Sequence, residues 1–310
     1  MSSPAPSKPV ASPPHHHTTR PLDAMAIAIV MLLCLSWGFN QVAVKLALHD
    51  VPPMLQATIR SVVAMILVMA WCAVRRVPLF RRDGTLIAGV VVGLMFGIEF
   101  GLIYQGLVYT TASRASVFLY LTPFIVVVGA RILMPADRFR PSQWLGLGLS
   151  FIGMIVAFGL PTPALDPRQT LGDVMMIVAA FIWAGTTLII KASRLNGTSP
   201  EKVMLYQLVV SAPMMALCAW FAGERIERWP DHQALAWMGY QAVWVVSVTF
   251  VIWFALIKKY SASRVSAFTF LTPLFGVAAG HFVLGEPLTP AFLMAVAFVA
   301  AGLVLVNRAK

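Results

Sequence analysis

The stretch ASRASVFLYLTPF at residues 112–124 returns as ASRVSAFTFLTPL at residues 262–274, 150 residues further along the chain. Eight of the thirteen aligned residues are identical, and the shared Leu-Thr-Pro places Pro123 and Pro273 at the same point of each copy. Both copies are predicted to be helices that open after the same serine, a residue type that caps helix N-termini. We interpret the two copies as equivalent helices of a duplicated unit, so the chain should be built from two structural repeats.

The composition predicts an all-α integral membrane protein. Of the 310 residues, 59% are hydrophobic and only 11% are charged, and the mean hydropathy is +0.81. A soluble protein of this length needs far more polar surface to cover its core. The three cysteines, Cys34, Cys72 and Cys218, lie in apolar segments without a CxxC spacing. We therefore expect neither a disulfide framework nor a metal site.

The basic residues favour membrane loops over a nucleic-acid partner. The formal net charge is +11, but Lys and Arg stand in short clusters between apolar segments, as they do in the cytoplasmic loops of membrane proteins. A nucleic-acid groove would carry them on one continuous face. The expected surroundings are a lipid bilayer, with no nucleic acid.

Ten apolar segments have a length near the roughly 20 residues that cross a bilayer. They cover residues 24–46, 54–74, 86–108, 115–134, 142–160, 171–192, 201–222, 233–257, 264–284 and 290–307. The short connections leave no room for a soluble catalytic domain. Residues 1–23, rich in Pro and Ser, are expected to form a disordered cytoplasmic tail.

The distribution of positive charge predicts the orientation. With the N-terminus inside, 17 of the 23 Lys and Arg residues lie on the cytoplasmic side. We therefore expect a multi-pass protein of the bacterial inner (plasma) membrane, with both termini cytoplasmic.

The duplication extends over the whole apolar part of the chain. Residues 37–45 align with residues 183–191, because each segment starts with Trp and ends with Lys. The first half covers residues 24–160 and the second half residues 171–307, with five predicted spans in each. An odd number of spans inserts the second half upside down, so we predict two inverted five-helix repeats.

An early Trp-Gly at residues 37–38, the paired Leu-Thr-Pro helices and Leu-Gly-Glu-Pro at residues 284–287 complete a familiar pattern. Together with the ten spans they resemble the EamA family of the drug/metabolite transporter (DMT) superfamily, and within it the YddG-like exporters of amino acids and related metabolites. The resemblance covers about residues 24–307. It implies a basket of spans 1–4 and 6–9 around a central cavity, with spans 5 and 10 peripheral.

Two charged residues, Arg60 and Glu99, lie inside predicted spans at a similar depth. Glycines at every fourth residue of 89–101 mark a packing face of the third span, and Glu99 projects roughly opposite to it. A carboxylate facing lipid is costly, so we predict that Glu99 faces an aqueous cavity. Two interpretations stay open: a structural ion pair, or Arg60 binding the carboxylate and Glu99 the ammonium of a zwitterionic substrate.

Aromatic and polar residues near mid-span complete the predicted site. Aromatic walls suit aromatic or cationic solutes, and intramembrane polar groups either bond across helices or line the pathway. The candidate substrate-binding residues are Trp37, Asn40, Gln41, Arg60, Glu99, Tyr104, Tyr120, Trp183, Thr187, Tyr206, Gln207, Trp253 and Phe270. Pro123 and Pro273 are the candidate hinges, since proline frees a backbone carbonyl. Arg114 and Arg264 are interpreted as interfacial anchors.

These features predict a secondary transporter that exports amino acids, aromatic ones among them, or related small amphipathic metabolites by alternating access. The sequence has no GxxxxGK[ST] motif, so we expect neither ATP hydrolysis nor a cofactor. An efflux pump for cationic drugs is one alternative, although the Arg60 cation would repel such substrates. The sequence leaves open the exact substrate and the direction of transport. It also leaves open whether transport is coupled to a proton through Glu99 or is uniport, and whether the protein is a monomer or a homodimer.

A membrane-embedded lipid-processing enzyme is the alternative from another functional class. It would need a cluster of catalytic side chains at a membrane surface. The loop with Glu224, Glu227, Asp231 and His232 is the only concentration of titratable groups. The same loop contains Arg225 and Arg228 and is more simply a solvated turn, so the protein is not expected to be an enzyme.

Overall fold

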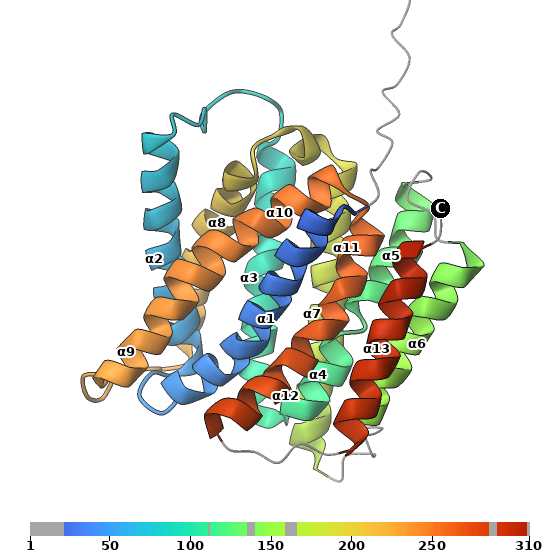
Figure 1. Cartoon of the computed structure of the whole chain (residues 1–310). Helices are drawn as coiled ribbons and strands as arrows, with labels where there is room; N and C mark the ends of the chain where they lie inside the picture. Colours follow the sequence, from blue (N-terminus) through green and yellow to red (C-terminus); the bar gives the residue numbers. More distant parts are fainter. Residues whose placement is uncertain (1–21, 111, 135–139, 159–165, 285–289, 309–310) are drawn as a thin grey trace, which may run out of the picture.

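The computed structural model describes residues 22–110, 112–134, 140–158, 166–284 and 290–308. Within these ranges the chain is helical and contains no β-strand (Figure 1). Eight helices are long and apolar enough to cross a membrane, and two shorter apolar helices cover Thr122–Leu133 and Pro141–Ala157. The protein is therefore an all-helical, multi-span membrane protein. Ten complete spans stay a prediction.

The helices follow the predicted segments. The first half contains α1 (Ala24–Ala47), α2 (Pro53–Val74), α3 (Leu86–Tyr109), α4 (Ala112–Leu119), α5 (Thr122–Leu133) and α6 (Pro141–Phe158). The second half contains α7 (Pro167–Ala192), the 3₁₀ turn η2 (Arg194–Gly197), α8 (Pro200–Phe221), α9 (His232–Gly239), the π-helix η3 (Tyr240–Thr249), α10 (Phe250–Lys259), α11 (Ala262–Ala267), the 3₁₀ turn η4 (Phe268–Phe270), α12 (Leu271–Leu284) and α13 (Pro290–Arg308).

Several helices start at residues that cap free backbone N–H groups. The Asp23 carboxylate accepts from the N–H of Ala26 at 2.8 Å and so opens α1. Ser199 does the same for the N–H of Lys202 at 3.2 Å, and the proline that follows it fits the first turn of α8. Such caps replace the intrahelical bonds that a first turn lacks.

The repeated Leu-Thr-Pro stretch interrupts its helix in both halves. The sequence predicted one span over residues 115–134, but the helix ends at Leu119 and restarts at Thr122. Pro123 has no N–H to bond the Leu119 carbonyl. The Thr122 hydroxyl donates to that carbonyl instead, at 2.7 Å. In the second half the turn η4 separates α11 from α12 at the same place.

α2 and α8 pack side by side and run in opposite directions. After α8, the Glu224 carboxylate accepts from the backbone N–H groups of Met54 and Leu55 at the start of α2, at 3.2 and 2.8 Å. After α2, Asp83 accepts from Lys202 near the start of α8, at 2.8 Å. The Lys202 hydrogen bond lowers the pKa of Asp83 below its ordinary value. We call the two ends of the bundle the Glu224 end and the Asp83 end.

α6 and α13 form a second antiparallel pair at the edge of the bundle (Figure 1). Gln143 near the start of α6 donates to the carbonyl of Val306 near the end of α13, at 2.7 Å. Gly302 permits the close approach, because a Cβ there would lie 2.4 Å from the Gly146 carbonyl oxygen. Small residues of this kind let backbones pack closely in lipid.

α1 crosses α12 at Gly38. A Cβ at this position would lie 2.5 Å from the Thr272 carbonyl oxygen and 2.7 Å from the Gly276 nitrogen, so only glycine fits without a shift. This contact holds the preceding residue, Trp37, in the interior of the bundle, where it is buried.

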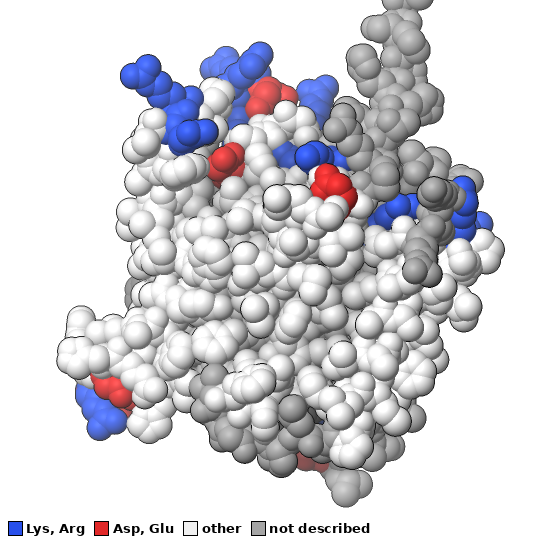
Figure 2. All heavy atoms as spheres, in the orientation of Figure 1, with Lys and Arg blue, Asp and Glu red and all other residues white. Residues whose placement is uncertain are grey.

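On the surface that Figure 2 shows, charged side chains avoid the middle of the molecule. Figure 2 shows most Lys and Arg residues of this face at the end where the loop after α2 lies, with a broad uncharged band next to it. A few charged residues lie beside α9 at the opposite end. An uncharged band of this kind suits the hydrocarbon core of a bilayer.

Candidate functional site

A cavity lies between helices of both halves of the chain. Its walls come from α1, α2, α3, the end of α4, α7, η3 and α10. The cavity volume is about 70 Å³, which is room for several waters. The lining residues are Trp37, Asn40, Val44, Arg60, Glu99, Phe100, Ile103, Tyr104, Leu107, Leu119, Tyr120, Trp183, Val245 and Phe250. Seven of them, Trp37, Asn40, Arg60, Glu99, Tyr104, Tyr120 and Trp183, were predicted from the sequence. The cavity occupies the half of the bundle nearer the Glu224 end, since Arg60 lies in the first part of α2.

Arg60 brings a buried positive charge to this cavity. Its side chain is 1% exposed, and its Cζ lies 4.1 Å from the ring centroid of Phe100 and 5.1 Å from that of Tyr104. Cation–π contact with the two rings stabilises the guanidinium. Its Nε and Nη2 have no hydrogen-bond partner among the described residues. These N–H groups are therefore available to an anionic group of a ligand.

Glu99 brings an acidic group to the same cavity without pairing to Arg60. It is 4% exposed, and within the described ranges no Lys or Arg nitrogen approaches its carboxylate to 4.0 Å. The structure therefore contains no direct Arg60–Glu99 ion pair. A basic and an acidic side chain therefore line one cavity without contacting each other.

Trp37 lies at the centre of the aromatic cluster. Its ring centroid is 6.3 Å from that of Trp183, 5.2 Å from that of Trp253 and 5.5 Å from that of Phe250. The indole N–H donates to the Thr249 hydroxyl at 2.8 Å. Edge-to-face packing and this hydrogen bond fix the orientation of the ring. Trp37 thus presents a rigid apolar face to the cavity.

Two tyrosines extend the aromatic wall. The Tyr120 ring packs edge-on against Trp183 at a centroid distance of 6.0 Å. The Tyr104 hydroxyl donates to Gln241 Oε1 at 3.1 Å, which links α3 to η3. Tyr120 lies between α4 and α5, directly before the break that Pro123 causes. Any movement at this break would displace a cavity wall.

The structure does not bring every predicted residue to the cavity. Trp253 packs against Trp37 at a centroid distance of 5.2 Å and does not line the cavity, and Phe270 packs against Phe124 at 6.0 Å between centroids. Thr187 is buried in α7 outside the lining. Pro273 follows the break in the second half.

Three further predicted residues have other positions. The Tyr206 hydroxyl lies 3.1 Å from the Thr85 hydroxyl, towards the Asp83 end. Gln207 is fully buried in α8 and does not line the cavity. The side chain of Gln41 lies outside what the structure describes.

The sequence analysis missed the apolar part of the lining. The missed residues are Val44, Phe100, Ile103, Leu107, Leu119, Val245 and Phe250. A signal was available, because Phe100, Ile103 and Leu107 recur at helical spacing on the face of α3 that carries Glu99. Phe100 and Phe250 are also 150 residues apart, the same offset as the repeated stretch.

Arg114, interpreted from the sequence as an interfacial anchor, has a protein partner in the structure. Its guanidinium forms an ion pair with the Asp173 carboxylate, and the Thr110 hydroxyl donates to the same carboxylate at 2.6 Å. The side chains of Arg114 and Asp173 are only 14% and 8% exposed. A charge-assisted ion pair of this kind fixes the position of the guanidinium. The pair joins α4 and the end of α3 to α7.

Comparison with known proteins connects this architecture to others. The family model described as the EamA-like transporter family matches residues 24–159 and 170–308. A probable amino-acid metabolite efflux pump of Salmonella typhimurium is 25% identical over 287 residues, which cover 89% of this chain and 92% of the pump. An uncharacterized transporter of Synechocystis is 28% identical over 295 residues, covering 88% of this chain and 86% of the relative. A solved crystal structure shares the fold with a TM-score of 0.78 at 19% identity, over 92% of this chain and 97% of that chain.

Proposed function

Because this chain belongs to the EamA-like transporter family, we propose that it exports amino acids and related small amphipathic metabolites across the bacterial inner membrane. The protein is a multi-span membrane transporter of small molecules and not an enzyme. In the transport that we propose, the cavity opens alternately to the two sides of the membrane.

The separate charges of Arg60 and Glu99 carry the proposal of an amino-acid substrate. A carboxylate can accept hydrogen bonds from the unpartnered Nε and Nη2 of Arg60, and an ammonium group can donate to Glu99. A single cationic or anionic solute would be repelled by one of the two groups. A zwitterion satisfies both.

The remaining walls suit the side chain of an amino acid. Trp37, Trp183 and Tyr120 present aromatic rings, and Phe100 and Phe250 add apolar surface. Such a wall stabilises aromatic and large aliphatic groups by packing. The relative from Salmonella typhimurium, described as a probable amino-acid metabolite efflux pump, supports the same substrate class.

We also propose that the chain forms ten spans in two inverted repeats, residues 24–160 and 171–307, with both termini in the cytoplasm. The antiparallel packing of α2 with α8 and of α6 with α13 supports this arrangement, because each pair joins helices at equivalent places of the two halves. An inverted second half follows from five spans per repeat.

Cysteine labelling tests the inverted topology. In a background without native cysteines, Arg82→Cys and Glu227→Cys place exposed thiols in equivalent loops of the two halves. We expect an impermeant thiol reagent to label Glu227→Cys in intact cells and Arg82→Cys only after the membrane is opened. Labelling of both variants in intact cells would contradict the inversion.

Transport by purified protein in proteoliposomes tests the substrate. A panel of labelled amino acids is offered with and without a proton gradient. Uptake should exceed that of empty liposomes, and it should be largest for aromatic and large aliphatic amino acids. A change of rate with the gradient would indicate a coupled proton, and no change would indicate uniport. Transport of a quaternary-ammonium dye without any amino acid would instead favour the cationic efflux pump.

A further inference from the structure

Gln207 has in the second half the place that Arg60 has in the first. Arg60 lies seven residues into α2 and Gln207 seven residues into α8, about 10 Å from each helix start at 1.5 Å per residue. Because α2 and α8 are antiparallel, Arg60 lies towards the Glu224 end and Gln207 towards the Asp83 end. The cavity is lined by Arg60 and not by Gln207.

Gln207 is a polar residue in a fully buried position. Its exposed fraction is 0%, and neither Oε1 nor Nε2 has a hydrogen-bond partner among the residues that the structure describes. Ser211, one turn further along α8, is equally buried, and its Oγ likewise has no partner in the described ranges. Met204 and Leu208, beside them on the helix, are buried and apolar. A packed interior disfavours unpartnered polar groups, so packing does not explain the Gln207 amide, whereas Ser211 is also a small residue at the contact of α8 with Gly97 of α3.

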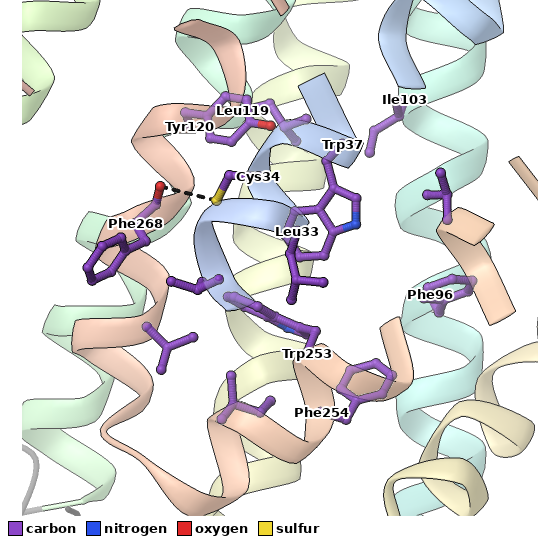
Figure 3. Packing of buried hydrophobic residues seen from close by; sticks show 14 of the residues in the cluster. Leu33, Cys34, Trp37, Phe96, Ile103, Leu119, Tyr120, Trp253, Phe254 and Phe268 are labelled. Carbon is purple, nitrogen blue, oxygen red and sulfur yellow. Dashed lines mark hydrogen bonds between the residues drawn. The ribbon is translucent and has the colours of Figure 1, made fainter. Parts of the chain in front are cut away.

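Apolar side chains close the cavity on the side of the Asp83 end. Trp37 lines the cavity, and Leu33, Phe96, Trp253 and Phe254 lie on its other side (Figure 3). All four are buried. Among the described residues these side chains lie between the cavity and the Asp83 end, and neither Gln207 nor Ser211 lines the cavity.

Contacts between α8 and the loop before α3 close the Asp83 end itself. Lys202 donates to Asp83 at 2.8 Å, and the Tyr206 hydroxyl lies 3.1 Å from the Thr85 hydroxyl. Lys202 and Tyr206 are on α8, within one and a half turns of Gln207. Separation of α8 from this loop would open a path to Gln207 from the Asp83 end.

We infer that Gln207 and Ser211 form a second solute subsite, which opens to the Asp83 side when α8 moves away from this loop. The inference rests on the proposed transport by alternating access. An amide offers N–H donors to a carboxylate and a carbonyl acceptor to an ammonium group. It carries no charge, so the subsite fits zwitterionic and neutral polar solutes. It should hold a carboxylate more weakly than Arg60 does, because neutral hydrogen bonds are weaker than charged ones.

Cysteine accessibility tests whether this subsite opens. Gln207→Cys is introduced into the full chain with Cys34, Cys72 and Cys218 replaced by alanine, and an impermeant methanethiosulfonate reagent is added to one face at a time. Leu208→Cys is the matched control, since this neighbour on α8 is equally buried but apolar.

We expect Gln207→Cys to react from the Asp83 side about tenfold faster than Leu208→Cys. Adding Lys202→Ala should raise the rate again by about tenfold, because it removes a charged hydrogen bond that keeps this end closed. Equally slow reaction of both cysteine variants, with and without Lys202→Ala, would overturn the inference. The assay needs no amino acid, so it decides on the opening even if the proposed substrate class fails.

Contact with solute is tested with L-phenylalanine as the probe. Gln207→Leu should unfold at the same temperature as the wild type or higher, yet raise the KM for uptake from the Asp83 side by up to about tenfold, the value of neutral hydrogen bonds. Gln207→Asn keeps the amide and should recover part of the loss. An unchanged KM in Gln207→Leu would show that Gln207 does not bind the solute. If the wild type takes up neither phenylalanine nor any other amino acid, the proposed function is contradicted instead.

Discussion

The double variant Arg60→Gln with Glu99→Thr is expected to remain folded and to lose most of its amino-acid transport. It gives the first half the residues that the second half has at the equivalent positions, Gln207 and Thr249. Each charged hydrogen bond to a zwitterion is worth about 1.5–3 kcal/mol, so kcat/KM should fall by about 100-fold or more. Uptake of labelled amino acids into proteoliposomes measures the loss.

The single variants separate substrate binding from a structural ion pair. Breaking a buried pair costs about 3–5 kcal/mol, and removing both partners restores much of the loss. The structure has no direct Arg60–Glu99 contact among the described residues, so we do not expect this pattern of stability. Instead, Arg60→Gln should impair amino acids but spare amines that lack the carboxylate, whose binding never used Arg60.

Thermal unfolding and transport of the wild type, both single variants and the double variant should be measured side by side. A double variant that is stable and fully active would eliminate the role of the two charges in substrate binding. Single variants that unfold easily, rescued by the double variant, would support the structural ion pair.

Seven of the fourteen residues that line the cavity were named from the sequence, because charge and repetition give strong signals in an apolar chain. A lone Arg60 or Glu99 inside a span must avoid lipid, and both residues do line the cavity. Trp37 and Trp183 were paired by the repeat alignment, and their rings meet at a centroid distance of 6.3 Å. The cost of placing a charge in lipid and the internal repeat can both be recognised in a single sequence.

The same signals do not show which residues line the cavity in the conformation that the structure has. Gln207 was matched to Arg60 by the duplication, but the cavity lies nearer one end of the bundle, so only Arg60 lines it. The sequence repeat shows which positions of the two halves are equivalent, but it does not show towards which end of the bundle the cavity lies. Phe100 and Phe250 carry no charge or polar group, so only their helical spacing and their 150-residue offset mark them in the sequence, and the structure brings both to the cavity.

Local breaks in the helices were also beyond the hydropathy pattern. Residues 233–257 read as one span, and the structure places a π-helical segment, η3, within it. Pro123 was predicted as a hinge candidate. The hydrogen bond that the Thr122 hydroxyl donates to the Leu119 carbonyl depends on local geometry and could not be predicted. The hydropathy pattern of a span is the same whether its helix is regular or interrupted.

Asp173→Asn is expected to destabilise the protein by about 3–5 kcal/mol, the cost of breaking a buried ion pair. It removes the charge that faces Arg114 and weakens the acceptor of the Thr110 hydroxyl. The pair joins α7 to α4 and to the end of α3, so its loss should loosen all three helices together. The free energy of unfolding in a mixed-micelle denaturant titration measures the effect.

Two further variants separate charge from packing at this site. The double variant Arg114→Met with Asp173→Leu removes both charges and retains apolar volume, so it should recover much of the stability that Asp173→Asn loses. Thr110→Val removes one hydrogen bond and should cost about 1 kcal/mol. A loss below about 1 kcal/mol in Asp173→Asn would mean that water reaches the pair and screens it, as it does for exposed ion pairs. Because the side chains of Arg114 and Asp173 are only 14% and 8% exposed, we expect the larger value.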